Sequence, residues 1–301
     1  MKIVHLSDLH LNPVYNHENI NKTRAFLKNV AEEGFDHLTI GGDIAHDADE
    51  ESFMIFRKML KEFDLLDSKR VSLTIGNHDI FGGVYTVSEL LNFPVRCRST
   101  DYEKKVNAFV SYFEELFMDC YFPSEDSIFP FAKFLDESVI IGINTIDKYS
   151  RIKNPFASNG KVTQTDFDNL QKIFGLESVK DRKKIILAHH HFYKNNLEAK
   201  SSSNELWNKI EGYTLKLRGK KKLLKEFKRN NVSLILHGHS HENKIYQRMG
   251  LNIYNSAGSI DNGFKDKYFT NEISFLGNEI RINENERKIS RVNESLVASP
   301  A

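Results

Sequence analysis

The chain has 301 residues, of which 40% are hydrophobic and 28% charged, a composition typical of globular proteins and unlike that of disordered or collagen-like ones. Its 42 Lys and Arg against 41 Asp and Glu give a formal net charge of +1, so bulk charge provides no argument for binding to nucleic acid or to membranes. The two cysteines, Cys97 and Cys120, are too few for a disulfide framework or a zinc site built from cysteine.

The sequence shows no signal of a membrane or secreted protein. Its longest apolar runs, such as Val139 to Ile143, are far shorter than the roughly 20 residues that cross a bilayer. His5, Ser7 and Asp8 interrupt the apolar core that an N-terminal signal peptide needs. We therefore expect a cytoplasmic protein.

The first part of the chain alternates buried strands with amphipathic helices. The apolar spacing predicts strands at Lys2 to Ser7, His37 to Ile40 and Val71 to Ile75, with helices at Asn19 to Glu33 and Asp49 to Phe63 between them. A β-α-β-α-β order of this kind indicates a parallel sheet with crossover helices.

The same alternation continues further along, and it ends in a different pattern. Further strands are predicted at Ser138 to Asn144, Lys184 to Ala188 and Val232 to Leu236, and further helices at Gln164 to Phe174 and Lys220 to Asn230. After that, short alternating runs predict an antiparallel end of the chain, and these runs are Lys244 to Arg248, Asn252 to Asn255, Glu272 to Phe275, Glu279 to Ile282 and Arg287 to Val292.

Two stretches interrupt this order, at about 81–131 and 192–219. The first is rich in aromatic residues with near-helical spacing around Glu103 to Phe117, which favours the core of a small cap over a base-stacking pocket. The second is polar and loop-like. We expect one domain over 1–294, with both stretches as cap-like insertions near the site, and a disordered tail at 295–301. Tyr85, Tyr193 and Asn195 are candidates for substrate contact.

Polar clusters follow five of the predicted strands. They are Asp8-Leu9-His10, Gly42-Asp43, Gly76-Asn77-His78-Asp79, His189-His190-His191 and Gly238-His239-Ser240-His241. In open α/β sheets, ligand sites form at the carboxyl ends of the strands. Imidazole, carboxylate and amide ligands without thiolate suit Mn²⁺, Fe or Zn²⁺ in a catalytic role, and the set is large enough for two ions about 4 Å apart.

The ordered set of motifs resembles the calcineurin-like metallophosphoesterase superfamily. That family's pattern is D-x-H, G-D, G-N-H-[D/E], a histidine at a strand end and G-H-x-H, and every block occurs here in order from Asp8 to His241. The resemblance implies a four-layer α/β/β/α sandwich of two mixed sheets, with the metal site at the carboxyl ends of the strands. The form of the motifs is most similar to the cyclic-nucleotide phosphodiesterase branch, with Phe192 where that branch has proline after the triple histidine.

The resemblance also implies a role for each site residue. Asp8, His10 and His241 would hold one metal ion, and Asn77, His189 and His239 the other. Asp43 would bridge the two ions. His78 would contact the phosphate and help the leaving group depart, oriented by Asp79. The choice of His189 over His190 rests on the family pattern alone.

The function that this implies is a dinuclear, metal-dependent phosphoesterase. A hydroxide bridging the two metal ions would attack the phosphorus of a phosphodiester, with a small or cyclic nucleotide favoured as substrate. The alternatives are a nuclease, against which the charge balance and the lack of an added DNA-binding domain count, a phosphomonoesterase, and a non-catalytic scaffold. The oligomeric state and the metal identity stay open.

Other polar residues near these motifs have two readings each. His190, His191 and His237 fit packed or supporting histidines better than ligands. His46 and Asp47 fit substrate contact and a capped helix start equally well, and Asn12 is a guess. The basic run from Lys216 to Arg229 favours the solvated face of a helix over a phosphate contact, because Leu223, Leu224 and Phe227 supply an apolar stripe.

Overall fold

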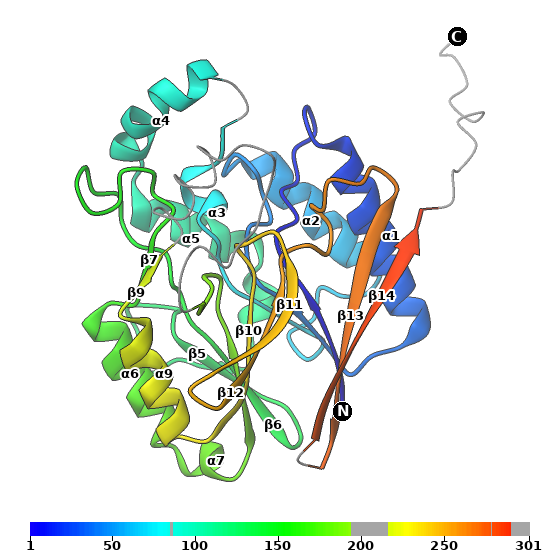
Figure 1. Ribbon diagram of the computed structural model, residues 1–301, viewed down its shortest axis with the longest axis vertical. Coiled ribbons are helices and arrows are strands. Elements are labelled where there is room, and N and C mark those ends of the chain that lie inside the picture. Colours follow the sequence, from blue (N-terminus) through cyan, green and yellow to red (C-terminus); the bar gives the residue numbers. More distant parts are fainter. Residues whose placement is uncertain (85–86, 194–215, 278, 290–301) are drawn as a thin grey trace.

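The computed structural model describes residues 1–84, 87–193, 216–277 and 279–289. Two mixed β-sheets form its centre (Figure 1). From one edge to the other, the first sheet contains β14 (Glu279–Lys288), β13 (Lys267–Leu276), β1 (Lys2–Leu6), β2 (His37–Ile40) and β3 (Val71–Leu73). The second contains β11 (Asn243–Arg248), β12 (Leu251–Ser256), β10 (Val232–His237), β8 (Lys183–Leu187), β6 (Ser138–Gly142), β5 (Phe131–Phe134) and β4 (Cys120–Tyr121). A small pair joins β7 (Gly160–Lys161) to β9 (Leu217–Arg218).

Parallel strands form the middle of each sheet, and antiparallel strands its edges. In the first sheet β1, β2 and β3 run parallel, and β13 and β14 are added antiparallel. In the second, β6, β8, β10 and β12 run parallel, with β11 antiparallel at one edge and β5 and β4 at the other. Within each sheet, the carboxyl ends of the parallel strands therefore lie at the same end of the sheet, where the strands stop and the loops begin.

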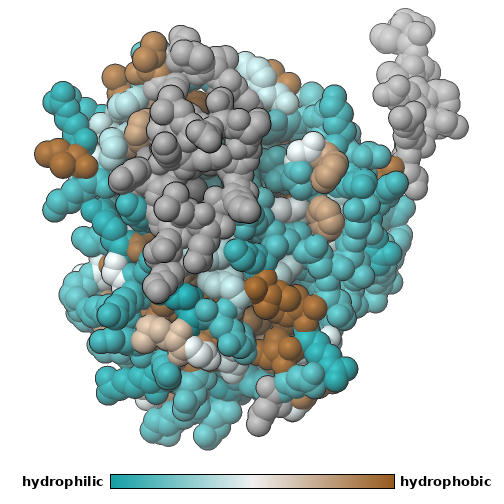
Figure 2. Space-filling view, in the orientation of Figure 1, coloured by the Kyte–Doolittle hydropathy of each residue, from teal (hydrophilic) through white to brown (hydrophobic). Residues whose placement is uncertain are grey.

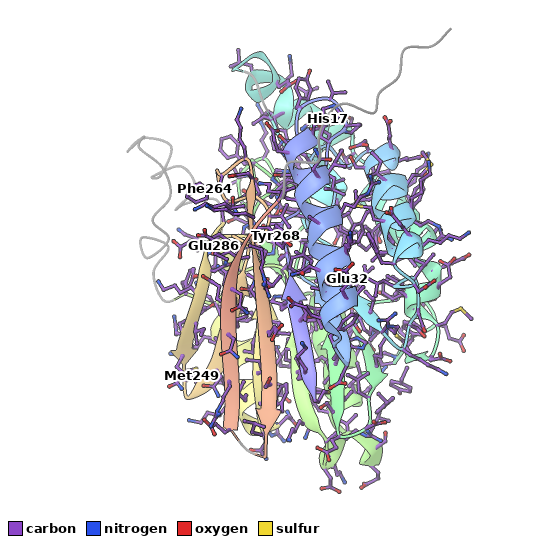
Figure 3. The ribbon with its side chains drawn as sticks, turned by 90° about the vertical axis from the view of Figure 1, so that its right-hand side faces the viewer. His17, Glu32, Met249, Phe264, Tyr268 and Glu286 are labelled. Atoms are coloured by element: carbon purple, nitrogen blue, oxygen red, sulfur yellow. The ribbon has the colours of Figure 1, made fainter. Side chains whose placement is uncertain are left out.

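Helices cover the outer face of each sheet (Figure 1). Those associated with the first sheet are α1 (His17–Glu33), α2 (Glu50–Glu62), α3 (His78–Phe81), α4 (Val87–Ser99), α5 (Tyr102–Tyr112) and the 3₁₀ turn η1 (Glu114–Phe117). The second sheet is covered by α6 (Gln164–Phe174), α7 (Glu177–Lys180) and α9 (Lys220–Arg229). Figure 3 shows α1 lying along the first sheet from His17 to Glu32.

Three hydrophobic clusters confirm the predicted four-layer α/β/β/α sandwich. One cluster lies between the first sheet and its helices, and a second between the other sheet and its helices. The third contains Ile3 and Ile273 from the first sheet with Ile185 and Leu234 from the second, so it lies between the two sheets. On β8, Ile186 joins the helix-facing cluster while its neighbour Ile185 joins the inner one, as the two-residue period of a strand requires.

The predicted elements are confirmed to within a few residues, with two corrections. The last two antiparallel runs are one ten-residue strand, β14, which ends at Lys288. The aromatic residues of the 81–131 stretch do not form the core of a separate cap. Phe109 and Phe113 belong to the main cluster on the first sheet, with ring centroids 5.6 Å from Phe53 and 6.0 Å from Phe56 of α2, respectively. Helical spacing predicts an apolar face without saying what it packs against.

The basic helix α9 agrees with its prediction, whereas the second insertion and the tail cannot be compared with the structure. On α9 the side chains of Leu223, Leu224 and Phe227 are buried and most of the basic ones are exposed, which confirms the solvated helix face. The surface over α6 and α9 is mostly hydrophilic in Figure 2. The predicted insertion at 192–219 lies mostly outside the described residues, and so does the tail at 295–301.

Among the described helices none has the length and apolar character needed to cross a bilayer.

A buried histidine at the start of β2 makes stability depend on pH. His37 is fully buried, with Nδ1 3.1 Å from the Lys69 carbonyl and Nε2 2.9 Å from the Ser72 hydroxyl. Burial, with a smaller contribution from Lys133, lowers its pKa from 6.5 to about 3. The unfolded state therefore binds the extra proton first, and stability is lost as the pH falls from 6.5 towards 3.

We expect His37→Gln to remove this part of the acid sensitivity. Between pH 7 and pH 4.5, the free energy of unfolding should fall by about 2 kcal/mol less in the variant than in the wild type. Urea unfolding at the two pH values measures this difference. His17→Gln, at an exposed position of α1, is the control. Equal acid losses in the wild type and in both variants would contradict the prediction.

Candidate metal centre

The structure brings the predicted ligands together at the carboxyl ends of the strands. Asp8 and the ligands of the second sheet meet directly, since the backbone N–H of His239 donates to both carboxylate oxygens of Asp8 at 3.0 Å. The seven candidates, each after its strand, are Asp8 and His10 (β1), Asp43 (β2), Asn77 (β3), His189 (β8), and His239 and His241 (β10).

Most of these residues have a backbone conformation that is rare for residues other than glycine. Asp8, His10, Asp43, His239 and His241 have φ angles of 56°, 45°, 53°, 75° and 47°, respectively. Each such residue costs on the order of 1–3 kcal/mol and persists only where its surroundings fix it. Here a hydrogen bond connects the loops after β1 and β2, because the backbone N–H of His10 donates to the Asp43 carbonyl at 3.0 Å. Such strain is typical of functional sites.

Two motif glycines leave room for the carboxylates. A Cβ on Gly76 would lie 2.1 Å from Oδ1 of Asp43, and one on Gly238 would lie 2.1 Å from Oδ2 of Asp8. Any larger residue would therefore displace a carboxylate of the site. This explains the glycine in the G-N-H and G-H-x-H motifs by close approach.

The first group of candidate ligands contains Asp8, His10 and His241, which can each offer one atom within 4.8 Å of the others. Nε2 of His10 lies 3.8 Å from Oδ1 of Asp8 and 3.9 Å from Oδ2 of Asp43. The His241 ring stacks on the His10 ring with centroids 5.0 Å apart.

The second group contains Asp43, His189 and His239, again within 4.8 Å. Nε2 of His189 lies 3.3 Å from Oδ2 of Asp43, 3.0 Å from Nδ1 of His239 and 3.1 Å from Oδ1 of Asn77. The same oxygen of Asp43 therefore lies between the two groups.

The donor set fits metal ions. Nδ1 of His189 lies 2.8 Å from the Gly41 carbonyl, which requires a proton on that nitrogen. In the neutral ring the lone pair is then on Nε2, which faces the acceptor oxygens of Asp43 and Asn77. The lone pair and these oxygens repel one another unless a cation or a proton lies between them. Both ring nitrogens of His10 are buried and have no hydrogen-bond partner among the described residues.

The pKa values of the site histidines reflect the negative charge of the buried carboxylates. Burial alone would lower the pKa of His189, but Asp43 and Asp8 outweigh it and raise the value to about 9. For His10, burial is likewise outweighed by Asp8 and Asp43, and the pKa rises to about 9. Burial would raise the pKa of Asp43, yet the surrounding histidines, above all His189, hold it well below its usual range. The pocket therefore attracts cations.

The expected orientation of His78 by Asp79 is wrong. The His78 ring is held through Nδ1, which lies 3.0 Å from the His46 carbonyl. The Asp79 carboxylate instead accepts hydrogen bonds from the backbone N–H groups of Asp43, Ala45 and Gly76, at 2.9–3.0 Å. Asp79 thus fixes the conformation of the loop that carries Asp43. His78 lies next to Asp43, because the backbone N–H of His78 donates to Oδ1 of Asp43 at 2.8 Å.

Hydrogen bonds to distant parts of the chain distinguish His190 and His237 from the candidate ligand His189. Nδ1 of His190 lies 2.9 Å from the Thr145 hydroxyl and Nε2 lies 3.1 Å from the Ser158 carbonyl, so both nitrogens are occupied by the protein. His237 is also held through both nitrogens, by the Gly238 carbonyl and the Tyr246 hydroxyl. These two histidines are packed residues, as predicted, because the protein engages both ring nitrogens of each.

Phe192 stands where the cyclic-nucleotide phosphodiesterase branch has proline, and the structure shows what the phenylalanine contributes. Its side chain is fully buried in the cluster of the second sheet, and its backbone N–H donates to the Tyr246 hydroxyl at 3.0 Å. Proline could not make this hydrogen bond.

His46 joins the site more closely than its sequence signal indicated. Its ring centroid lies 5.6 Å from that of His10 and 5.0 Å from that of His78, and the three rings can present nitrogens within 4.8 Å. It is not part of a helix cap, because Asp49 caps α2 by accepting from the Ser52 N–H. Asp47 accepts a hydrogen bond from the amide of Asn12 at 2.7 Å, which ties two site loops together.

The substrate candidates do not gain support. Tyr193 is buried, and its hydroxyl accepts a hydrogen bond from the amide of Asn255 at 3.2 Å, so it belongs to the interior. Tyr85 and Asn195 lie outside the described residues.

Comparison with known proteins identifies the family. The sequence profile of the calcineurin-like phosphoesterases matches residues 1–243. The chain belongs to this family. No curated protein gives a significant match. Among solved structures, a dimetal phosphatase from Danio rerio has a TM-score of 0.60 at 10% identity, covering 96% of this chain and 99% of its own.

A phosphopantetheinyl hydrolase from Mycobacterium tuberculosis has a TM-score of 0.44 at 12% identity, covering 85% of this chain and 88% of its own. At these identities the likeness to the fish phosphatase shows a common fold. The family assignment makes this chain a metallophosphoesterase with a candidate centre for two metal ions.

Proposed function

We propose that the protein is a dinuclear metal-dependent phosphoesterase that hydrolyses a phosphodiester. The observation that carries the proposal is the position of Oδ2 of Asp43, 3.9 Å from Nε2 of His10 and 3.3 Å from Nε2 of His189. One carboxylate between two groups of nitrogen and oxygen ligands is the arrangement that a bridged pair of ions needs. Asp8, His10 and His241 would hold one ion, and Asn77, His189 and His239 the other.

The ions, when bound, supply Lewis-acid activation of the phosphoryl group and of a water molecule. The chain supplies the rest. Asp79 holds the Asp43 loop through the backbone N–H groups of Asp43 and Ala45 and its own loop through that of Gly76, so the bridging carboxylate is fixed in advance. Nδ1 of His78 donates to the His46 carbonyl, so Nε2 is the atom that would meet the leaving oxygen. It can deliver a proton there only from the doubly protonated ring, which burial disfavours by lowering the pKa of His78 to about 4.

A small or cyclic nucleotide is the substrate class that we favour. The motif forms Gly42-Asp43-Ile44-Ala45-His46 and His189-His190-His191 support it, through their similarity to the cyclic-nucleotide phosphodiesterase branch. A nuclease is the second candidate, and the formal net charge of +1 counts against it, because nucleic-acid grooves are strongly basic. A phosphomonoesterase ranks third. A non-catalytic scaffold ranks last because no candidate ligand is missing.

A substrate panel tests the proposal. Purified protein is loaded in turn with Mn²⁺, Fe or Zn²⁺, its metal content is measured, and hydrolysis of bis-(p-nitrophenyl) phosphate, cyclic nucleotides, phosphomonoesters and single-stranded DNA is compared. We expect two ions per chain and higher kcat/KM on small diesters than on monoesters or DNA. A folded, metal-loaded protein inactive on every phosphoester would favour the scaffold.

A further inference from the structure

The loop between β12 and β13 approaches one ligand of the candidate centre. The side chain of His241 is 40% exposed, whereas those of His10, His189 and His239 are buried. Its Nδ1 lies 3.7 Å from Oδ2 of Asp261, a residue of this loop. This separation is slightly beyond hydrogen-bond distance, and both side chains are half-exposed.

A metal-binding histidine commonly donates its second ring N–H to an acceptor, which fixes the ring and makes the ligating nitrogen more basic. His189 has such an acceptor in the Gly41 carbonyl, at 2.8 Å. His241 has positive φ and lies in a loop, so nothing in its own element restrains its ring. The carboxylate that faces its Nδ1 is that of Asp261.

A buried lysine holds this loop in place. Lys22 of α1 is 2% exposed, and its Nζ donates to the carbonyls of Ile260 at 2.5 Å and Phe264 at 2.9 Å. Burying an ammonium group is costly unless its hydrogen bonds are made, so both carbonyls are strong anchors for it. The two anchored residues flank Asp261, which fixes the backbone on either side of the carboxylate.

The surrounding charges fit this arrangement. Burial lowers the pKa of Lys22, and Asp261 and Glu18 oppose that shift. Two neighbouring lysines have other partners: Lys265 of the loop pairs with Glu18 at 3.9 Å, and Lys267, the first residue of β13, pairs with Glu286 at 2.9 Å.

We propose that Asp261 is a positioning residue for the metal centre, which orients His241 through Nδ1 and is itself held in place by the buried Lys22. The inference rests on the proposed function only in taking His241 as a ligand. It predicts that the ion on the Asp8, His10 and His241 side depends on the loop more than the other ion does.

The test measures metal retention as well as activity. We expect Asp261→Asn to weaken binding of one of the two ions by about 10- to 100-fold, measured as chelator competition and metal content per chain. Lys22→Met, which removes the anchor, should give a smaller weakening of the same ion. Hydrolysis should recover when the metal concentration is raised, and Asp261→Glu should restore part of the affinity. The control is Asp266→Asn, an exposed carboxylate of the same loop.

The outcomes separate this inference from the proposed function. If Asp261→Asn holds both ions as tightly as the wild type and Asp266→Asn, the positioning role is overturned while the dinuclear centre stands. If the wild-type protein binds no ion, both are overturned. If it binds two ions and hydrolyses nothing, the retention assay still decides the role of Asp261. Because that side chain is 38% exposed, the substitution leaves the core intact.

Discussion

Replacing Asp43 with asparagine is expected to abolish hydrolysis, with a loss of kcat/KM of at least about 10³-fold, or about 4 kcal/mol of transition-state stabilisation. Its Oδ2 lies between the two ligand groups, 3.9 Å from Nε2 of His10 and 3.3 Å from Nε2 of His189, and its buried negative charge attracts cations to both. The asparagine keeps the shape and can still accept the His78 N–H, so the variant changes the charge of the site more than its packing.

Metal content is the decisive measurement for Asp43→Asn. Both ions should be lost or retained far more weakly, because the change removes a ligand from each group. Asp168→Asn, an exposed carboxylate on α6, is the control, and urea unfolding of the apo forms checks that the variant folds. A variant that keeps two ions and full turnover would show that Asp43 does not bridge them.

The parts of the site that the sequence predicts are those set by local order. Asp8, Asp43 and Asn77 directly follow predicted strands, and parallel strands end at one edge of a sheet. Their residue types and order were therefore enough to place them in one centre. The structure adds two reasons for these motifs that cannot be derived from the sequence. Asp8 and Asp43 have positive φ angles, and Gly76 lies too close to the carboxylate of Asp43 to carry a side chain.

The remaining parts depend on contacts between segments far apart in the chain. His189 and His190 are neighbours at the same strand end, and contacts with distant segments distinguish them: His190 meets Thr145 and Ser158, more than 30 residues away, whereas His189 meets Gly41, Asp43 and Asn77. The role of Asp79 was misread because its three partners are backbone N–H groups, which carry no sequence signal. Asp261 was missed because an acidic residue in a polar turn is unremarkable until the fold brings it to His241.

The same limit explains the corrections to the fold. Periodicity identified the apolar faces of the 103–117 segment, but the choice between a cap and the main core depends on α2, whose Phe53 and Phe56 receive these rings. The end of the antiparallel hairpin was also misjudged, since ten-residue pairing between β13 and β14 carries charged residues on β14 that hide the strand pattern.

His78→Ala should leave both ions bound and slow the chemistry by about 10²- to 10⁴-fold. His78 is not needed in either ligand group around Asp43, and its ring is held by the His46 carbonyl rather than by a candidate ligand. Its proposed task is at the leaving oxygen, so the loss should appear in kcat, with KM little changed. Metal content and steady-state kinetics on a small diester measure both effects, with His17→Ala as the exposed control.

The leaving group distinguishes a proton donor from a residue that only shapes the pocket. A p-nitrophenolate departs without needing a proton, whereas an alkoxide such as a ribose oxygen depends on one. The loss in His78→Ala should therefore be only about 10-fold on bis-(p-nitrophenyl) phosphate and reach the full range on an alkyl or ribose diester. An equal loss on both substrates would assign His78 to phosphate binding instead, and full turnover on both with the ions retained would remove it from the mechanism.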